Sequence, residues 1–292
     1  MNFADRLVGR VRALGPLCVG IDPHPGRVPD LFGGDTPQGL AAWGMAVVDA
    51  CRDKVAIVKP QVGLFERHGP EGMAALQAVM ERAKSRDLLV LADAKRGDIG
   101  STAEGYASAY LASDAPFQAD CVTVNPYMGL DTLEPFLRLA EENGKGVAVL
   151  ARTSNPGAAD FQAKSIGGQA LWAEVADRLA PAMDRLVGQQ RWSSLMLVAG
   201  ATGPDEARQL RKIAPRALFL VPGYGTQGAG AADAVAGFVE GTSSLEGGVV
   251  NASRSITFAP GTETPANYAD WQAAITEAVD VAQADLRAAT AL

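Results

Sequence analysis

The chain has 292 residues, of which 48% are hydrophobic and 20% are charged, and this composition excludes an intrinsically disordered protein. Its 32 glycines and 17 prolines are too few for a fibrous repeat. The net charge is −7 and the basic residues are scattered, which excludes nucleic acid and anionic membranes as expected partners but leaves room for a small anionic ligand.

Short apolar runs alternate with longer helical segments along the whole chain. Runs of Val, Leu and Ile without strict alternation are typical of parallel strands that are covered on both faces. Eight such runs predict strands at residues 17–22, 55–60, 88–95, 121–126, 146–152, 195–201, 218–223 and 248–253. Eight helices are predicted to follow them, at residues 37–53, 70–86, 102–113, 131–143, 167–188, 204–213, 230–239 and 266–289.

Eight consecutive βα units favour a (β/α)8 barrel that spans residues 1–292 as a single domain. An additional amphipathic helix is predicted at residues 2–14, where it would cap the N-terminal face of the barrel. A doubly wound open sheet is built from the same unit, so the hydrophobic pattern alone leaves it as the alternative. The count of eight favours the barrel.

The cysteines and histidines give little indication of a metal or disulfide site. Cys18, Cys51 and Cys121 are odd in number and form no C-x-x-C pair, which favours a reduced, cytoplasmic setting. The N-terminus lacks the apolar run of a signal peptide, and no stretch approaches 18 apolar residues. The two histidines, His24 and His68, show no metal-ligand spacing, so no metal site is expected.

Charged residues gather at the ends of the predicted strands, where barrel enzymes form their active sites. An apolar strand runs directly into Asp93, Lys95 and Asp98, and Lys59 ends the preceding strand. Burying such charges is costly unless they pair with each other or with a ligand. A salt-bridge network that locks the barrel mouth is the structural alternative, but four charges favour a functional site. The polar residues at strand ends are Asp22, Lys59, Asp93, Lys95, Asp98, Asn125, Arg152, Thr153, Ser154, Gln227, Ser253 and Arg254.

A phosphate site is predicted from the last two strands. The glycine-rich loop at residues 223–230 follows the seventh strand, and Ser253 and Arg254 follow the eighth, which is the usual phosphate location in these barrels. Glycines permit close backbone approach, helix N-termini offer N–H donors, and arginine binds phosphate bidentately.

The strand-end residues Lys59, Asp93, Lys95 and Asp98 belong to the motifs IVKPQ and DAKRGDIGSTAEGYA. These motifs resemble those of the orotidine 5′-phosphate decarboxylase family, in its longer-chain bacterial branch. The sharpest resemblance is DAKRGDIGSTAEGYA, which begins at Asp93 and contains Asp-x-Lys-x-x-Asp. Further resemblances follow in family order over most of the chain: VGIDPHP, IVKPQ, VNPYMG, RTSNPGA, PGYGTQG and ASRSI.

The resemblance implies decarboxylation of orotidine 5′-phosphate to UMP, the last step of pyrimidine nucleotide synthesis, with no metal or organic cofactor. It implies that Lys95 is the ammonium group that stabilises a carbanion at C6 and protonates it. Asp93 would lie near the departing carboxylate, and Lys59 and Asp98 would complete an alternating charge array.

The resemblance also implies a homodimer with shared active sites, in which Asp98 and Thr102 reach the ribose bound by the partner. Asp22 and Lys59 would hold ribose hydroxyls, and Ser154 the pyrimidine edge. For Asp22 a turn cap, and for Ser154 a turn position, are the structural alternatives. The remaining implied substrate contacts are Pro222, Gln227, Ser253 and Arg254.

Three other functions use related residues. A magnesium-dependent sugar-phosphate decarboxylase or aldolase shares the Asp-x-Lys-x-x-Asp pattern but uses acidic metal ligands. A Schiff-base aldolase needs an unprotonated lysine, whereas flanking carboxylates would keep Lys95 protonated. A non-catalytic nucleotide-binding protein would not need all four charged positions.

Overall fold

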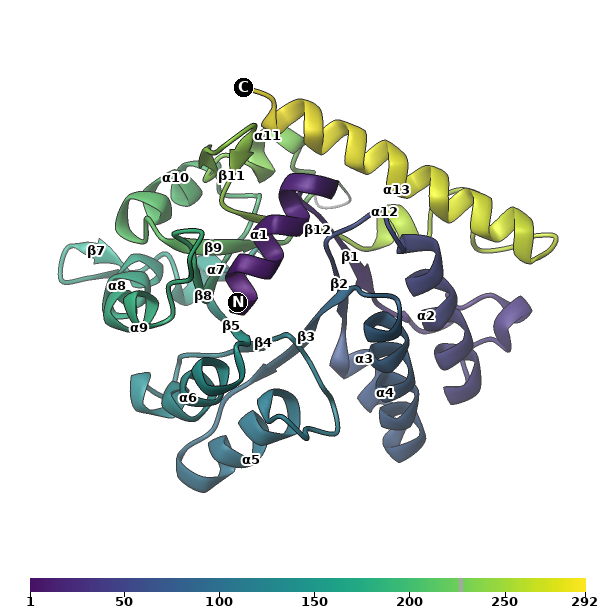
Figure 1. Ribbon diagram of the computed structural model, residues 1–292, viewed down its shortest axis with the longest axis horizontal. Coiled ribbons are helices and arrows are strands. Elements are labelled where there is room, and N and C mark those ends of the chain that lie inside the picture. The colour runs from purple at the N-terminus through teal and green to yellow at the C-terminus, as the bar shows by residue number, and fades with distance from the viewer. Residues whose placement is uncertain (226–227) are drawn as a thin grey trace.

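The computed structural model describes residues 1–225 and 228–292, which form a closed barrel with helices around its outside (Figure 1). Within these residues the barrel has eight parallel strands in the order β1-β12-β9-β8-β5-β4-β3-β2. The predicted (β/α)8 barrel is confirmed, and the alternative prediction of an open doubly wound sheet is wrong. The barrel strands are β1 Leu17–Ile21, β2 Ile57–Pro60, β3 Leu89–Arg96, β4 Cys121–Val124, β5 Gly146–Arg152, β8 Ser193–Ala199, β9 Ala217–Val221 and β12 Gly248–Ala252.

The helices and the small hairpins fill the connections between the strands. The helices are α1 Phe3–Leu14, α2 Pro37–Cys51, α3 Val62–Glu66, α4 Gly69–Ser85, α5 Gly100–Leu111, α6 Glu134–Asn143, α7 Ala158–Phe161, α8 Leu171–Arg178, α9 Ala180–Arg185, α10 Pro204–Ile213, α11 Ala231–Ala234, α12 Arg254–Thr257 and α13 Tyr268–Thr290. Two 3-10 helices are η1 Asp30–Phe32 and η2 Leu130–Leu133. Two hairpins pair β6 Ser165–Ile166 with β7 Gln169–Ala170, and β10 Val239–Glu240 with β11 Leu245–Glu246.

Side-chain caps explain where several helices begin. The Thr36 hydroxyl accepts a hydrogen bond from the Gly39 amide at the start of α2, and Pro37 occupies the first turn, where a missing N–H costs nothing. The side chains of Asn2 and Asn267 cap α1 and α13 in the same way. The helix predicted at residues 266–289 therefore begins at Tyr268, directly after its cap Asn267.

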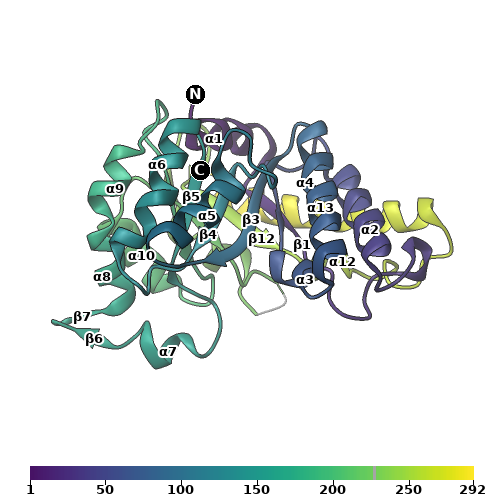
Figure 2. The ribbon, with the colours of Figure 1, turned by 90° about the horizontal axis from the view of Figure 1, so that it is seen from below.

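Two apolar cores hold the barrel. One lies between the outer face of the strands and the surrounding helices. The other fills the barrel interior and includes Phe3, Leu7 and Val8 of α1 packed with inward residues of the strands. Figure 1 shows α1 crossing one end of the barrel, and Figure 2 shows α7 and the β6–β7 hairpin projecting at the opposite end. The predicted N-terminal cap is therefore present, and it leaves the carboxyl ends of the strands open.

Two predicted helices are broken in the structure. The predicted helix at 167–188 begins as the β6–β7 hairpin, whose Gly167 and Gly168 both have positive φ, and continues as α8 and α9. Pro181 lies in the first turn of α9. Proline is tolerated in a first turn but would disrupt the interior of a continuous helix, so the chain forms two helices instead of one. The predicted helix at 230–239 ends at Ala234, because Gly237 packs so closely on Phe219 that a Cβ would lie 2.7 Å from its ring.

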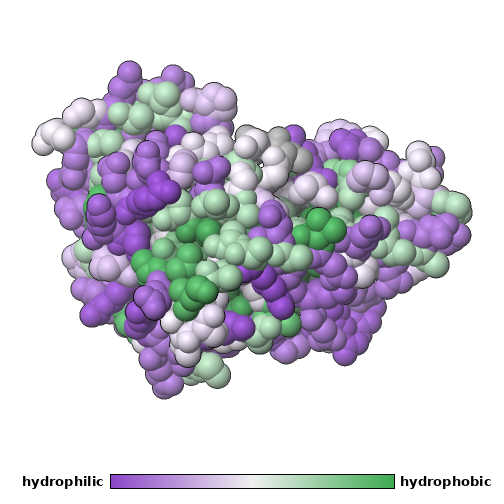
Figure 3. All heavy atoms as spheres, turned by 90° about the horizontal axis from the view of Figure 1, so that it is seen from above, coloured by the Kyte–Doolittle hydropathy of each residue, from purple (hydrophilic) through white to green (hydrophobic). Residues whose placement is uncertain are grey.

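The face that carries α13 has hydrophobic residues in the middle of the view and hydrophilic residues towards its edges (Figure 3). Val281 of α13 is one exposed apolar side chain of this helix. Despite its 23 residues, neither α13 nor any other helix of the described chain combines the length and the apolar character that a membrane span needs.

Candidate active site

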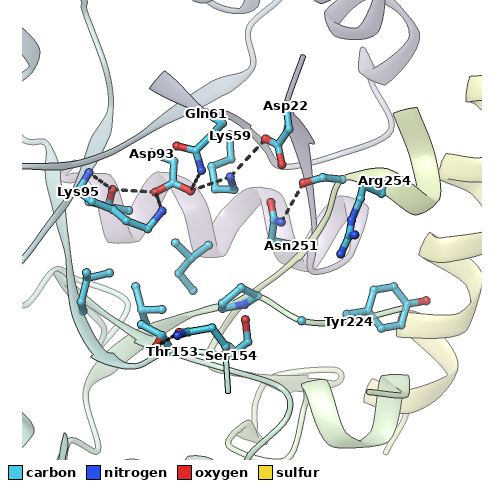
Figure 4. Close-up of a pocket in the computed structure, with 18 of the residues that line it drawn as sticks. Asp22, Lys59, Gln61, Asp93, Lys95, Thr153, Ser154, Tyr224, Asn251 and Arg254 are labelled. Atoms are coloured by element: carbon cyan, nitrogen blue, oxygen red, sulfur yellow. Dashed lines mark hydrogen bonds and ion pairs between the residues drawn. The ribbon is translucent and has the colours of Figure 1, made fainter. Parts of the chain in front are cut away.

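A pocket of about 460 Å³ opens at the carboxyl ends of the barrel strands (Figure 4). Parallel strands all end at this mouth, so side chains that are far apart in the sequence meet there. Eight of the residues predicted from the sequence line it, namely Asp22, Lys59, Asp93, Lys95, Ser154, Pro222, Ser253 and Arg254. The predicted contact Gln227 lies outside the described residues.

The charged residues form one continuous network on the β1–β2–β3 side of the mouth. Lys59 Nζ lies 2.9 Å from Asp93 Oδ2 and 3.6 Å from Asp22 Oδ1. Lys95 Nζ lies 2.6 Å from Asp93 Oδ1. The Lys95 side chain is 47% exposed, against 5% for Lys59 and 8% for Asp93, so Lys95 is the ammonium group that a molecule in the pocket would meet.

Two neutral donors complete the surroundings of the Asp93 carboxylate. Gln61 Nε2 donates to Oδ2 at 2.9 Å, and Thr123 Oγ1 donates to Oδ1 at 2.9 Å. Together with the two lysines, each carboxylate oxygen accepts two hydrogen bonds. Such saturation makes a buried carboxylate tolerable and fixes its orientation.

The surroundings set the charges of the network at neutral pH. Burial alone would raise the pKa of Asp93, but Lys59 and Lys95 outweigh it and hold that pKa far below its usual range. Burial would lower the pKa of Lys59, but Asp22 and Asp93 outweigh it and raise that pKa. Asp93 therefore stabilises the fold above about pH 4, and this contribution is lost as the pH falls. The contribution of Lys59 is present below about pH 10 and is lost as the pH rises further.

Figure 4 shows Arg254 on the far side of the pocket from Asp93 and Lys95, and Ser253 precedes it at the junction of β12 and α12. Ser253 fits against β1 only because residue 20 is glycine: a Cβ there would lie 1.8 Å from Ser253 Oγ. Asn251 Nδ2 donates to Ser253 Oγ at 3.2 Å. Gly223, with φ of 100°, brings the backbone after β9 to the same end. An exposed guanidinium beside a hydroxyl and a glycine-containing turn suits a dianionic group.

The loop after β5 forms a third wall of the pocket. Thr153 and Ser154 line it, and the Thr153 amide donates to Gln162 Oε1 at 2.8 Å. Ser154 accepts a hydrogen bond at its carbonyl from Thr202 Oγ1 at 3.3 Å. Arg152 pairs with Glu206 of α10 at 3.4 Å. The start of the loop is therefore anchored by these contacts, and Ser154 lines the pocket.

Comparison with known proteins identifies the family. The sequence model described as "Orotidine 5'-phosphate decarboxylase / HUMPS family" matches residues 15–267. The chain belongs to this family. A protein of Salinispora arenicola named orotidine 5'-phosphate decarboxylase is 44% identical over 233 residues, which are 80% of this chain and 82% of that protein. One of the same name from Rhodopirellula baltica is 36% identical over 291 residues, covering 94% and 95% of the two chains.

Solved structures agree with this membership. The structure of Leishmania donovani OMP decarboxylase is similar to this chain with a TM-score of 0.76 and 30% identity, covering 97% of this chain and 99% of that one. The decarboxylase family thus accounts for the barrel and for the order of its strand-end motifs.

Asp98 and Thr102 lie apart from the charge network. Neither is among the described residues that line the pocket, and Asp98 Oδ1 accepts a hydrogen bond from the Ile99 amide at 2.8 Å. Asp98 lies between β3 and α5, and Thr102 lies in the first turn of α5. Exposed apolar side chains occur beside Asp98 and in the segment after β4, namely Ile99, Tyr127, Met128 and Leu130. The predicted array of Lys59, Asp93, Lys95 and Asp98 is therefore present in the described chain without Asp98.

Sequence reasoning missed Gln61 and Thr123. Thr123 is a polar residue within the apolar strand CVTV, and Gln61 lies two positions after Lys59, where an extended chain points both side chains the same way. The polar residue within an apolar strand and the two-residue spacing from Lys59 are the sequence features that could have identified these two residues. Asn251, on β12 beside Ser253, was also overlooked as a pocket residue.

The buried ion pairs predict a stability effect that is independent of any ligand. Lys59→Met leaves Asp93 and Asp22 without their buried counter-charge and should lower the free energy of unfolding by about 3 kcal/mol, measured by urea denaturation. The double variant Lys59→Met/Asp93→Asn should lose at least about 1 kcal/mol less free energy of unfolding than the two single variants lose together.

The matched control is Lys54→Met, which breaks the surface pair between Lys54 and Asp280. It should cost at most about 1 kcal/mol. Equal losses for Lys59→Met and Lys54→Met would show that the network does not depend on buried charge pairing.

Proposed function

We propose that this protein decarboxylates orotidine 5′-phosphate to UMP and CO2, the last step of pyrimidine nucleotide synthesis, and that residues 1–292 form a single barrel domain. The observation that carries the proposal is the Lys59–Asp93–Lys95 network at the mouth of a barrel of this family. It presents a half-exposed ammonium group, oriented by a buried carboxylate, to a pocket with an arginine at its other end.

The chemistry requires charge stabilisation. Loss of CO2 from the pyrimidine leaves an electron pair at C6 with little resonance relief, so the site must stabilise a developing negative charge. The Lys95 ammonium group is fixed by Asp93 before any substrate binds, so little reorganisation is needed when that charge appears. Lys95 then transfers a proton to C6 and gives UMP.

Asp93 has a second role in this proposal. Placed against the substrate carboxylate, its negative charge would repel that group, and the repulsion would be relieved as neutral CO2 departs. Its low pKa ensures that it is ionised throughout the neutral range. Lys59 keeps this charge compatible with burial.

The remaining contacts follow the length of the pocket. With the pyrimidine over Lys95, the ribose hydroxyls would meet Asp22 and Lys59, and the phosphate would reach Ser253 and Arg254. Ser154 would face the pyrimidine edge. Pro222 borders the phosphate end, and Gln227 is assigned there from its place in PGYGTQG.

The proposal includes a homodimer with shared active sites. The exposed apolar side chains of Ile99, Tyr127, Met128 and Leu130 are suited to burial against a second copy. Asp98 and Thr102 would then reach the ribose held by the partner chain. A cytoplasmic location is part of the same proposal, and the three free, buried cysteines are consistent with a reducing compartment.

The magnesium-dependent alternative fits the geometry less well. A carboxylate that ligates a metal must offer it a lone pair, whereas both oxygens of Asp93 already accept hydrogen bonds from lysine, amide and hydroxyl donors. The Schiff-base alternative needs a lysine nitrogen that is available for attack, whereas Lys95 Nζ is engaged in a 2.6 Å hydrogen bond to Asp93 Oδ1.

The experiment that tests the function is the turnover of orotidine 5′-phosphate by the purified protein in excess EDTA, followed by absorbance with UMP confirmed as product. We expect full conversion, with a rate that added magnesium does not increase. Failure to convert it, together with magnesium-dependent action on sugar phosphates, would assign the protein to the alternative class.

Mixed dimers test the shared site. Combining Asp98→Ala and Lys95→Ala subunits should restore one complete site per heterodimer, and hence about half of the wild-type activity per heterodimer. The matched control combines Asp98→Ala with Thr102→Ala, which leaves one defect in every site and should restore nothing. Absence of recovery in isolated Asp98→Ala/Lys95→Ala heterodimers would mean that Asp98 acts within its own chain.

A further inference from the structure

We propose that Thr123 is a positioning residue for the decarboxylation, because its hydroxyl group holds the Lys95 backbone and the Asp93 carboxylate in their working arrangement. The inference rests on the proposed function and extends it to a residue outside the charged array. It is carried by the register of the β3–β4 pair, by the backbone at Lys95 and by two hydrogen bonds.

The β3–β4 pair is irregular at the site. Ala92 pairs with Val122, and the next paired residues are Arg96 and Val124. Asp93, Ala94 and Lys95 therefore face the single residue Thr123, so β3 bulges where its two charged residues lie. Bulges re-aim side chains near active sites and leave backbone groups without ladder partners.

The backbone of Lys95 is in a strained conformation. Its φ is +47°, in the left-handed region that residues other than glycine rarely adopt. Such a conformation persists only where the surroundings hold it. Here the Lys95 amide donates to Thr123 Oγ1 at 2.8 Å. The hydroxyl thereby replaces the backbone partner that this N–H would have in a regular pair of strands. The hydroxyl thus anchors the strained residue.

The same oxygen also orients the carboxylate. Because Thr123 Oγ1 accepts from the Lys95 amide, its own hydrogen can point to Asp93 Oδ1, 2.9 Å away. Lys95 Nζ donates to that same Oδ1 at 2.6 Å. The hydrogen bonds close a ring that runs from the Lys95 amide through the hydroxyl and the carboxylate to the Lys95 ammonium group. Thr123 is 1% exposed, so water cannot easily replace the hydroxyl.

Two pairs of variants isolate the hydroxyl. Thr123→Val keeps the shape of threonine and removes the hydroxyl, whereas Thr123→Ser keeps the hydroxyl and removes the methyl group. Thr123→Ala, compared with Thr123→Ser, gives the same contrast without the bulk of valine, so it decides the matter if the valine variant does not fold. Thr290→Val is the control, because Thr290 is a buried threonine at the far end of α13 whose hydroxyl donates to the Leu286 carbonyl at 2.9 Å.

The measurements are kcat for orotidine 5′-phosphate and, by calorimetry, the dissociation constant for UMP. A misplaced lysine should slow the chemical step while nucleotide contacts elsewhere persist. We expect Thr123→Val and Thr123→Ala to lower kcat about 10- to 100-fold, with the UMP dissociation constant changed less than about threefold. Thr123→Ser should stay within about fivefold of the wild-type kcat, and Thr290→Val should equal it. A crystal structure of Thr123→Val should show Lys95 out of its left-handed conformation or its Nζ displaced from Asp93.

The outcomes separate this inference from the proposed function. If the wild type turns over orotidine 5′-phosphate and Thr123→Val does so equally well, the positioning role is overturned while the function stands. Equal losses in Thr123→Ser and Thr123→Ala would also overturn it, because the hydroxyl would then make no difference. If the wild type has no such activity, the proposed function fails and this inference fails with it.

Discussion

The carboxylate of Asp93, buried between the ammonium groups of Lys59 and Lys95, is the interaction on which the site depends. A carboxylate at the end of a buried strand is unfavourable by itself, and its two lysines and two neutral donors make it tolerable. The same carboxylate fixes the Lys95 ammonium group at the pocket surface through the 2.6 Å contact with Asp93 Oδ1. The features that stabilise the folded chain thus also prepare the group that acts on the substrate.

The barrel supplies the geometry that this interaction needs. Because parallel strands end together, Asp22, Lys59 and Asp93 come from three neighbouring strands and meet within hydrogen-bonding or ion-pairing distance. At the other end, α1 packs its apolar side chains against inward residues of the strands, so the charged pocket lies at the end that α1 does not cover. The separation of a packed, apolar end from a charged, open end is general for this architecture.

Much of the fold could be predicted from the sequence, because long apolar runs and capping residues act locally. Residues 146–152 and 204–213 form the predicted strand and helix with the same bounds. The break in the helix predicted at 167–188 arises from Pro181 and the Gly167-Gly168 turn, which a simple periodicity count overlooks. The early end of the helix predicted at 230–239 depends on the contact of Gly237 with Phe219, which only the tertiary structure shows.

The charged residues of the site could be predicted from the sequence, but the backbone conformation that positions them could not. In a regular extended strand, residues two apart point to the same face, so the sequence predicted that Asp93 and Lys95 would lie close together. That prediction assumed a regular strand. In the structure the two residues meet through a bulge and a left-handed residue, which depend on the pairing of β3 with β4. For this reason the roles of Thr123 and Gln61 could not be deduced from sequence alone.

The most direct measurement of the central claim is the activity of Lys95→Ala compared with its affinity for UMP. The account predicts no measurable decarboxylation, because the group that stabilises and protonates the carbanion is gone, while UMP binding remains within about tenfold of the wild type. Near-normal turnover by this variant would contradict the account and remove Lys95 as the proton donor.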